Sequence, residues 1–460
     1  MATVNSQPNL LEGNLFPKIL KFVLPLMLTN LLQMLYNAAD MIVVGMSGVS
    51  GALGAIGTTG AMINLILNVF MGFSVGANVV VARSIGAGER GETQRAVHTS
   101  LCVAVLAGLL GCTIGQAVCH PTLIMLGDEG HILELATLYS RIYFAGAPFI
   151  SVTNFCIAIF RAKGDTKTPL IVLAFSGAVN VVLNLLFVLV FGMSVDGVSL
   201  ATVLSNVLSA AILVIKLMKD TGWCRVQLRK LTIHWKTFKD IIYVGIPAAI
   251  QGALFSISNM LIQSSIVRIN NQMYPGGSAV IDGNAAAGNL EGFAYTLTNS
   301  VAQAAVTFTS QHYGAGKIRR IAKVRWNCYL ISFLVATLTV GLILTFQKPL
   351  ICLYVRDAAA VDAATIRNWI MLLPYFTLGF METGSFILRG MGRSVTSTVI
   401  SLLGACVFRV IWVLTIFEAN PTLECIYLSY PISWALTALA HFILGQIVWR
   451  KELKKEINPA

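Results

Sequence analysis

The amino-acid sequence predicts an all-α polytopic membrane protein whose twelve transmembrane helices form two six-helix bundles. Of its 460 residues, 56% are hydrophobic and only 11% are charged, whereas charged residues make up about 25% of a soluble domain. Hydrophobic runs long enough to cross a bilayer occur twelve times, and several motifs of the first half recur in the second. The same composition excludes a disordered chain, a coiled coil and a secreted disulfide scaffold.

The twelve hydrophobic runs follow one another with short polar or Gly/Pro-containing breaks. They cover residues 17–45, 52–82, 93–119, 131–160, 169–191, 196–219, 239–268, 279–312, 319–347, 360–388, 396–417 and 422–449. We expect a tail at 1–16, an N-terminal bundle at 17–219, a linker at 220–238, a C-terminal bundle at 239–449 and a second tail at 450–460. The first residues have neither the basic region nor the cleavage site of a signal peptide, so no removable leader is expected.

The Lys and Arg residues predict the orientation of the chain in the membrane. If the N-terminus is cytoplasmic, the tails and loops on its side carry 26 of the 32 Lys and Arg residues. The positive-inside rule then places both termini in the cytoplasm of a multi-pass cell-membrane protein. Because topology explains the net charge of +12, nucleic acid is not an expected partner.

The segment between the halves, 221–239, is basic and carries four interleaved apolar residues, Trp223, Leu228, Leu231 and Trp235. Two readings are open. It is either an amphipathic helix on the inner leaflet or an ordinary charged linker.

An internal repeat relates the two halves. At one offset of 228 residues, Gly86-Ala87-Gly88 recurs as Gly314-Ala315-Gly316, Pro121 as Pro349, Arg161-x-x-Gly164 as Arg389-x-x-Gly392, and Thr168 as Thr396. Pro25 and Pro247 differ by 222. Six helices per half is an even number, so both halves enter the membrane in the same orientation. A pseudo-two-fold axis along the membrane normal, with a cleft between the bundles, is therefore expected.

The first hydrophobic run contains an acid, Asp40. An ionised carboxylate at membrane depth costs about 2.5–3.5 kcal/mol, so it needs a partner, a water-filled cavity or a proton. Thr29, Gln33, Tyr36 and Asn37 share a helical stripe with Asp40. A hydrogen-bonded helix contact explains the amides well but an acid poorly, so Asp40 is predicted to be functional.

Other polar residues of the first half are predicted to line a cavity around Asp40. They are Tyr139 and Asn154 in the fourth run, Ser176, Asn180 and Asn184 in the fifth, and Thr202 and Asn206 in the sixth. For each amide, a hydrogen bond between helices is an equally good explanation.

The second half has two acids and a base at membrane depth. Glu291 shares a stripe with Tyr295, Glu382 shares one with Arg389, and Arg409 lies within the eleventh run. One open alternative is a purely architectural ion pair of Arg409 with Glu291 or Glu382, which would neutralise part of this charge. Two acids against one deep base would leave a net negative substrate cavity or second cation site.

No motif for catalysis, metal binding or a cofactor is found. The nine Cys residues lack metal-ligand spacing and are predicted to be core residues. The six His residues form no i, i+4 pair, and no nucleophile, phosphate-binding or dinucleotide signature occurs. We therefore expect a transporter without a cofactor or metal rather than an enzyme.

Four segments resemble the multidrug and toxic compound extrusion (MATE) transporters, in particular their bacterial DinF-like branch. They are KILKFVLPLMLTNLLQMLYNAADMIVVG (18–45), RSIGAGERGE (83–92), IFRAKGDTKTP (159–169) and GVSLATVLSN (197–206). The similarity spans 15–450. It implies export of drug-like, often cationic compounds in exchange for H⁺ or Na⁺. It also implies that Asp40 is the ion site and that Tyr139, Asn154, Asn180 and Thr202 line its cavity. Asn184 stands where the family often has an acid, and the seventh-helix Glu of the Na⁺-coupled branch has no counterpart in 247–258.

The resulting hypothesis is a cation-coupled antiporter that works by alternating access, as a monomer in the lipid bilayer. Two alternatives stay open. A lipid-linked oligosaccharide flippase of the same superfamily would need several cavity cations, and this chain offers chiefly Arg409. A membrane-embedded enzyme would need a catalytic constellation or a large extramembrane domain.

Overall fold

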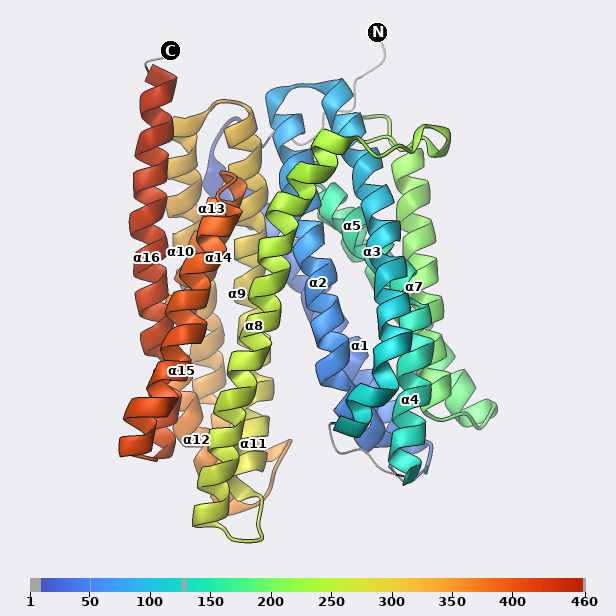
Figure 1. The fold of residues 1–460 in the computed structure, drawn as a ribbon, viewed down its shortest axis with the longest axis vertical. Coiled ribbons are helices and arrows are strands. Elements are labelled where there is room, and N and C mark those ends of the chain that lie inside the picture. Colours follow the sequence, from blue (N-terminus) through green and yellow to red (C-terminus); the bar gives the residue numbers. More distant parts are fainter. Residues whose placement is uncertain (1–9, 50, 126–129, 458–460) are drawn as a thin grey trace. The chain divides into compact units, whose positions relative to one another are not determined.

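The computed structural model describes residues 10–457 except 50 and 126–129. The described residues form helices joined by short loops, with no β-strand among them (Figure 1). The first half contains α1 (Leu15–Met46), α2 (Ala52–Ala87), α3 (Arg90–Met125), α4 (Gly130–Ala145), α5 (Ala147–Ala162), α6 (Lys167–Leu185) and α7 (Val195–Met218). The second half contains α8 (Trp235–Met273), α9 (Ala279–Gly314), α10 (Ile318–Thr345), α11 (Gln347–Cys352), α12 (Ala358–Leu372), α13 (Phe376–Gly390), α14 (Ser394–Ser401), α15 (Phe408–Trp412) and α16 (Leu423–Ile457).

Each of the twelve predicted hydrophobic runs corresponds to a helical span. Within the described residues, nine spans are long and apolar enough to cross a membrane, and the pairs α4/α5 and α12/α13 add two spans that are each bent by 50°. The remaining run is α9, whose 36 residues are long enough but less apolar. The prediction of an all-α, multi-pass membrane protein is confirmed.

The internal repeat is visible in the helix positions. α3 and α10 begin at residues 90 and 318, α4 and α12 at 130 and 358, and α7 and α16 at 195 and 423, each pair 228 residues apart. Both bent spans occupy equivalent positions and have the same bend. Since repeated sequence has produced repeated helices, the offset also identifies equivalent residues inside the two halves.

Contacts divide the chain into two compact units. We call residues 24–249, with the start of the described chain, the N-terminal unit, and residues 12–23 together with 250 onward the C-terminal unit. The first helix of each half changes unit beside its proline, α1 next to Pro25 and α8 next to Pro247. The start of α1 packs in the C-terminal unit, where the ring of Phe22 meets that of Phe308 edge to face at 5.4 Å.

Glycines of α2 allow the start of α8 to pack closely within the N-terminal unit. A Cβ atom at Gly72 would lie 2.5 Å from the backbone nitrogen of Ala249, and one at Gly76 would overlap the carbonyl oxygen of Ile241. Because only glycine leaves room for these backbones, side chains at both positions are excluded.

The linker does not form the amphipathic helix that was one of its two predicted readings. One 3-10 turn, Leu228–Lys230, is its only helix, and α8 begins at Trp235. Cys224 and Val226 are buried in the core of the N-terminal unit. The backbone N–H of Gln227 donates to Nε2 of His98 at 3.0 Å. Buried apolar anchors and backbone hydrogen bonds hold this segment as an ordered, irregular linker.

The cysteines are separate thiols, and six of the nine are buried, as core residues should be. Cys102 and Cys112 are half-buried and Cys352 is exposed, so the core prediction fails for Cys352. Among the described residues, no group of three His, Cys, Asp or Glu side chains is arranged to hold a metal ion.

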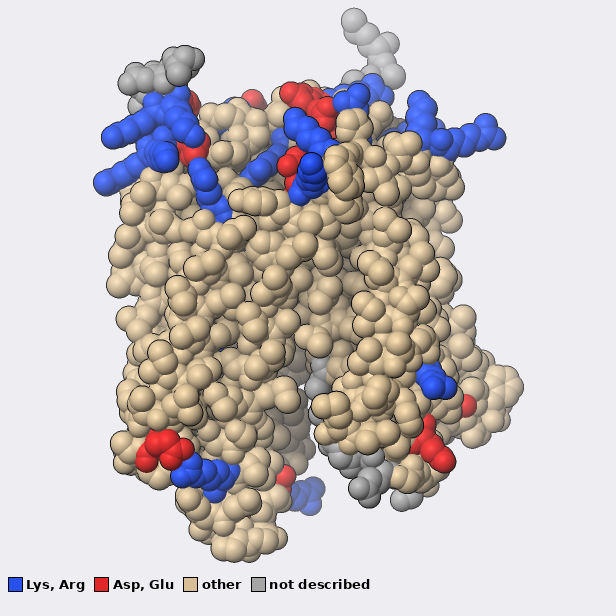
Figure 2. Space-filling model, in the orientation of Figure 1, with Lys and Arg blue, Asp and Glu red and all other residues tan. Residues whose placement is uncertain are grey.

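Charged side chains avoid the middle of each unit's surface. On the face shown in Figure 2, Lys and Arg gather at one end of each unit, and the surface between the ends is almost free of charge. Many Leu, Ile and Val side chains of the long helices are exposed, including Leu106, Leu110, Leu338 and Leu342. Exposed aliphatic side chains on long helices are the surface that a lipid bilayer requires.

Candidate functional site

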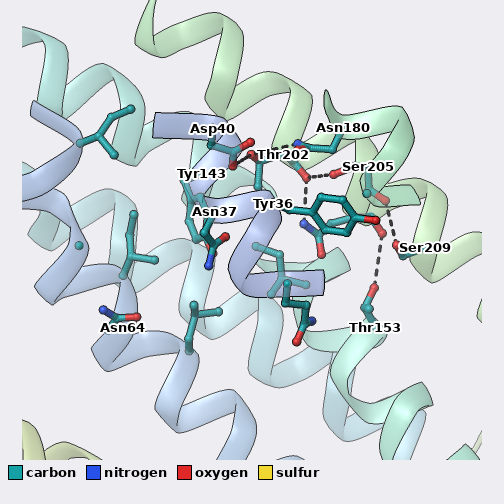
Figure 3. A pocket seen from close by; sticks show the side chains of 18 of the residues that line it. Tyr36, Asn37, Asp40, Asn64, Tyr143, Thr153, Asn180, Thr202, Ser205 and Ser209 are labelled. Atoms are coloured by element: carbon teal, nitrogen blue, oxygen red, sulfur yellow. Dashed lines mark hydrogen bonds between the residues drawn. The ribbon is translucent and has the colours of Figure 1, made fainter. Parts of the chain in front are cut away.

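The N-terminal unit contains a partly open cavity of about 650 Å³. It is lined by six helices, α1, α2, α4, α5, α6 and α7. Its polar lining comprises Gln33, Tyr36, Asn37, Asp40, Thr59, Asn64, Asn68, Tyr139, Tyr143, Thr153, Asn154, Ser176, Asn180, Thr202, Ser205, Asn206 and Ser209. Asp40 is the only charged side chain among these described lining residues (Figure 3).

The spacing along α1 explains why it presents a polar face to the cavity. Gln33, Tyr36, Asn37 and Asp40 follow one another at helical spacing and all line the cavity. Thr29 lies outside the lining. It is buried and donates to the carbonyl oxygen of Pro25 at 2.8 Å. Thr29 therefore belongs to the proline-containing turn rather than to the cavity.

Asp40 lies in a closed ring of hydrogen bonds. Nδ2 of Asn184 donates to Oδ1 of Asp40 at 2.5 Å, and Oγ1 of Thr202 donates to Oδ2 at 3.3 Å. Nδ2 of Asn184 also lies 3.3 Å from Oδ1 of Asn180, whose own Nδ2 donates to Oγ1 of Thr202 at 3.5 Å. Figure 3 shows Asp40, Thr202 and Asn180 pointing toward one another. The ring thus joins α1, α6 and α7.

Neutral groups alone solvate the Asp40 carboxylate. No Lys, Arg or His of the described chain forms an ion pair with it, and its hydrogen-bond donors are one amide and one hydroxyl. A carboxylate in a partly dry site without a counter-ion is costly to keep charged. This arrangement can take up a proton or a cation without first breaking an ion pair.

Asn184 carries an unused acceptor beside this carboxylate. Its side chain is fully buried, and its Oδ1 has no hydrogen-bond partner in the described part of the chain. If the Asp40 carboxyl gained a proton, rotation of the Asn184 amide would bring that oxygen to the new O–H donor. One residue can therefore serve both protonation states.

Two further predicted residues line the cavity but stand apart from the ring. The ring of Tyr139 stacks on that of Tyr143 at 6.2 Å, and Nδ2 of Asn154 donates to the carbonyl oxygen of Ile150 on its own helix. No hydrogen bond joins either side chain to Asp40 among the residues that the structure describes.

Tyr36 fastens the cavity face of α1 to α6. Its hydroxyl donates to the carbonyl oxygen of Ala174 at 3.0 Å, and its ring fills the space that a Cβ atom at Gly177 would need. This contact positions the helix that carries Asp40.

Several lining residues were not predicted. Tyr143 and the α2 amides Asn64 and Asn68 are the main examples. The four-residue spacing of the two amides inside an apolar run was the available signal. Nothing in the sequence separates Tyr143 from an ordinary aromatic core residue.

Arg409 forms neither of the two ion pairs that were open alternatives, among the residues that the structure describes. Glu291 instead pairs with Arg367, whose Nη2 lies 2.5 Å from Oε2 of Glu291. Arg367 also donates to the carbonyl oxygen of Asn284 at 3.2 Å. The fold buries Arg367 beside α9.

The expectation of a net negative interior in the C-terminal unit is wrong. Glu382 is buried and makes no ion pair within the described chain. Arg389 is buried and donates to Oε1 of Gln251 at 2.7 Å. Arg367, Arg389 and Arg409 thus outnumber the two acids. Tyr295, predicted beside Glu291, is 44% exposed and accepts a hydrogen bond from Asn299.

A family model described as MatE matches the chain twice, over residues 25–186 and 247–415. The chain belongs to the MATE family. The two matches begin at Pro25 and Pro247, in agreement with the internal repeat. Family membership confirms a membrane transporter and excludes the membrane-embedded enzyme.

Curated relatives and solved structures cover nearly the whole MATE chain. A probable multidrug resistance protein NorM of Thermotoga maritima is 26% identical over 84% of this chain and 82% of its own. The multidrug export protein MepA of Staphylococcus aureus is 23% identical over 94% of each chain. A solved outward-facing multidrug resistance MATE transporter of the MOP superfamily superposes with a TM-score of 0.89 at 22% identity, covering 98% of this chain and 99% of that chain.

Proposed function

We propose that this MATE protein is a secondary active multidrug exporter of the cell membrane, in which Asp40 couples inward movement of a cation to outward movement of substrate. The observation that carries the proposal is one carboxylate, held by neutral donors, in the wall of a large cavity. Relatives named as multidrug resistance or multidrug export proteins support the substrate class.

We favour H⁺ over Na⁺ as the coupling ion because of the atoms that face Asp40. An amide nitrogen and a hydroxyl donate to its oxygens. A bound Na⁺ would need an oxygen ligand where the Asn184 amide nitrogen now lies, since hard cations are held by oxygen atoms. A proton needs only the carboxylate and the spare oxygen of Asn184.

Proton exchange at Asp40 would act on both substrate and structure. In the ionised form, Asp40 attracts cationic or amphipathic compounds into the cavity and accepts hydrogen bonds from α6 and α7. Protonation from the outer side removes the charge, weakens both charge-assisted hydrogen bonds and releases α1 to move at Pro25. Substrate then leaves, and deprotonation on the cytoplasmic side restores the binding form. This is an alternating-access cycle.

The remaining parts of the proposal follow from the sequence. Both termini lie in the cytoplasm because most Lys and Arg residues belong to that side. We propose that 17–219 and 239–449 are the two transport bundles and that the chain works as a monomer surrounded by lipid. The cavity wall mixes amides and hydroxyls with Met41, Ile63, Leu67 and Met71, which suits substrates of varied shape.

The test is transport in inverted membrane vesicles with an acidic lumen. Wild-type protein is expected to accumulate a cationic dye, and Asp40→Asn, inserted at the wild-type level, is expected to lose at least nine-tenths of that rate (roughly tenfold, as for one charged interaction). Asn206→Ala is a matched control, because Asn206 lines the same cavity but donates to its own helix. Dye accumulation at the wild-type rate by Asp40→Asn would falsify the proposal. Imposing sodium and proton gradients separately decides the ion.

A further inference from the structure

Arg409 is a buried cation with neutral partners only. Its side chain is 5% exposed. Nε donates to Oγ of Ser433 at 3.0 Å, Nη1 donates to Oδ1 of Asn259 at 3.4 Å, and the guanidinium lies 4.2 Å from the ring centre of Tyr430. No carboxylate of the described chain lies within ion-pair distance. A buried charge without a counter-ion is costly, and a ligand of opposite charge would lower that cost.

The guanidinium of Arg409 also has N–H donors that make no hydrogen bond within the described chain. An Arg side chain has five N–H donors, and two of them are used by Ser433 and Asn259. Buried Arg nitrogens without a partner do occur in this protein, namely Nε of Arg161, Arg320, Arg325 and Arg389, but no atom of Arg409 is among them. Nη2 of Arg409, which makes no hydrogen bond within the described chain, is therefore not fully enclosed and is the atom left for a ligand.

The internal repeat identifies the surroundings of Arg409 as a second version of the Asp40 cavity. At the offset of 222, Asn37 corresponds to Asn259. At 228, Thr202 and Ser205 correspond to Tyr430 and Ser433. Asn37, Thr202 and Ser205 line the N-terminal cavity, and their three equivalents are the groups that contact Arg409.

The charge of this second site is reversed. Asp40 corresponds to Ile262, which is fully buried in the apolar core, and Asn184 corresponds to Trp412. The acid and its amide donor are thus replaced by apolar groups. The charged residue of the second site, Arg409, stands where the first half has Val181.

The backbone on both sides of Arg409 is irregular in a way that is frequent at functional sites. π-helical turns at Leu402–Val407 and Val413–Phe417 enclose the short helix α15. The second turn has an equivalent in the first half, Leu186–Val190, whereas residues equivalent to the first turn lie within the regular helix α6. The extra π-turn therefore belongs to the Arg409 side alone.

We propose that Arg409 anchors an anion subsite in the C-terminal unit, which takes the carboxylate of an amphipathic organic acid. The planar N–H fork of Arg matches the two oxygens of a carboxylate, and one positive charge balances one negative charge. Tyr430 and Trp434 beside the guanidinium offer aromatic surface to the apolar body of such a compound. The inference goes beyond cation coupling at Asp40, and it concerns binding rather than transport.

The experiment measures binding by the purified full-length protein, with calorimetric titration of 1-naphthoate, uncharged 1-naphthamide and 1-naphthyl phosphate. Naphthoate is expected to bind at least about tenfold more tightly than naphthamide, as a charged hydrogen-bonded pair requires. Arg409→Gln is expected to abolish this preference. Arg268→Gln, which removes an exposed Arg paired with Glu418, is expected to retain it.

Asn259→Asp keeps the inference testable if Arg409→Gln fails to fold. A carboxylate at this position, beside Nη1 of Arg409, would occupy the subsite from within. This variant is expected to raise the melting temperature and abolish the naphthoate preference. The inference is overturned if the wild type binds naphthoate and naphthamide equally, or if the preference survives in Arg409→Gln or Asn259→Asp. It is also overturned if Arg268→Gln loses the preference, or if naphthyl phosphate binds more tightly through Arg409.

Discussion

Asn184 donates a hydrogen bond of 2.5 Å to the carboxylate of Asp40, which lies 144 positions earlier in the chain. Because this donor is an amide, the Asp40 carboxylate stands alone among neutral side chains in the described lining of the cavity. Its charge depends on two donors, Asn184 and Thr202. Each donor can be removed separately, and the two have different expected effects.

Asn184→Ala is expected to lower proton-driven dye accumulation by about tenfold, because a hydrogen bond to a charged group contributes roughly 1.5–3 kcal/mol. The charged carboxylate would lose its shortest contact, and Oδ1 of Asn184 would no longer be available to the protonated form. Initial rates in inverted vesicles measure the effect. Equal losses in Asn184→Ala and Asn206→Ala would show that the amide acts only by packing.

Thr202→Val is expected to have a smaller effect than Asn184→Ala, about threefold to tenfold on the same rate. Its hydroxyl is 3.3 Å from Oδ2 of Asp40 and also lies 3.0 Å from the carbonyl oxygen of Val198, so its proton is shared between two acceptors. Thr202→Ser keeps the hydroxyl and serves as the control. If Val and Ser variants transport alike, the hydroxyl has no part in the ring.

The sequence was sufficient to predict the helices and the polar face of α1 but not the neighbours of each charge. Periodicity places Gln33, Tyr36 and Asp40 on one face because each residue of an α-helix is rotated by a fixed angle from the one before it. It does not say which helix lies opposite, so Arg367 was not recognised as the partner of Glu291. Which side chains of two helices meet depends on how the helices bend and cross. The bends in α4/α5 and α12/α13 change which residues face the neighbouring helices.

Cys224 is expected to resist thiol-directed labelling across the neutral pH range. Burial raises the pKa of the Cys224 thiol to about 12, and nearby Lys163 offsets this only in part. At pH 8 the thiolate fraction would be about one in ten thousand, and the thiolate is the reactive form. Because the folded pKa is raised, reactivity should stay low until the pH approaches 12 or the linker unfolds.

Two single-cysteine variants test this, one that keeps only Cys224 and one that keeps only the exposed Cys352. With a maleimide reagent at pH 7–9, Cys352 should label within minutes and Cys224 should label only in denaturant. Fast labelling of Cys224 in the folded protein would contradict the buried, ordered linker.

Gly177→Ala is expected to destabilise the protein by about 1–3 kcal/mol, the usual cost of overpacking a filled site. The ring of Tyr36 occupies the position of the added methyl group, so α1 and α6 would have to separate and Asp40 would move away from Asn184. Gly57→Ala is the matched control. Gly57 lines the same cavity, but a Cβ there meets nothing within 4 Å. The measurement is the thermal unfolding midpoint together with dye transport.

Glu291 and Arg367 are expected to stabilise the fold by neutralising each other, so losing one of them should cost more stability than losing both. Arg367 is buried and Glu291 is half-buried. Removing one partner of such a pair leaves a poorly compensated charge and costs up to about 3 kcal/mol, whereas replacing both can be neutral. Glu291→Gln and Arg367→Met should therefore each lower the unfolding midpoint strongly, and the double variant should recover most of the loss. Because Arg367 also holds the carbonyl oxygen of Asn284, recovery should be incomplete. Additive losses of stability in the double variant would contradict this prediction, because they would mean that the two side chains contribute independently. Glu291 would then act on a ligand or ion instead of neutralising Arg367.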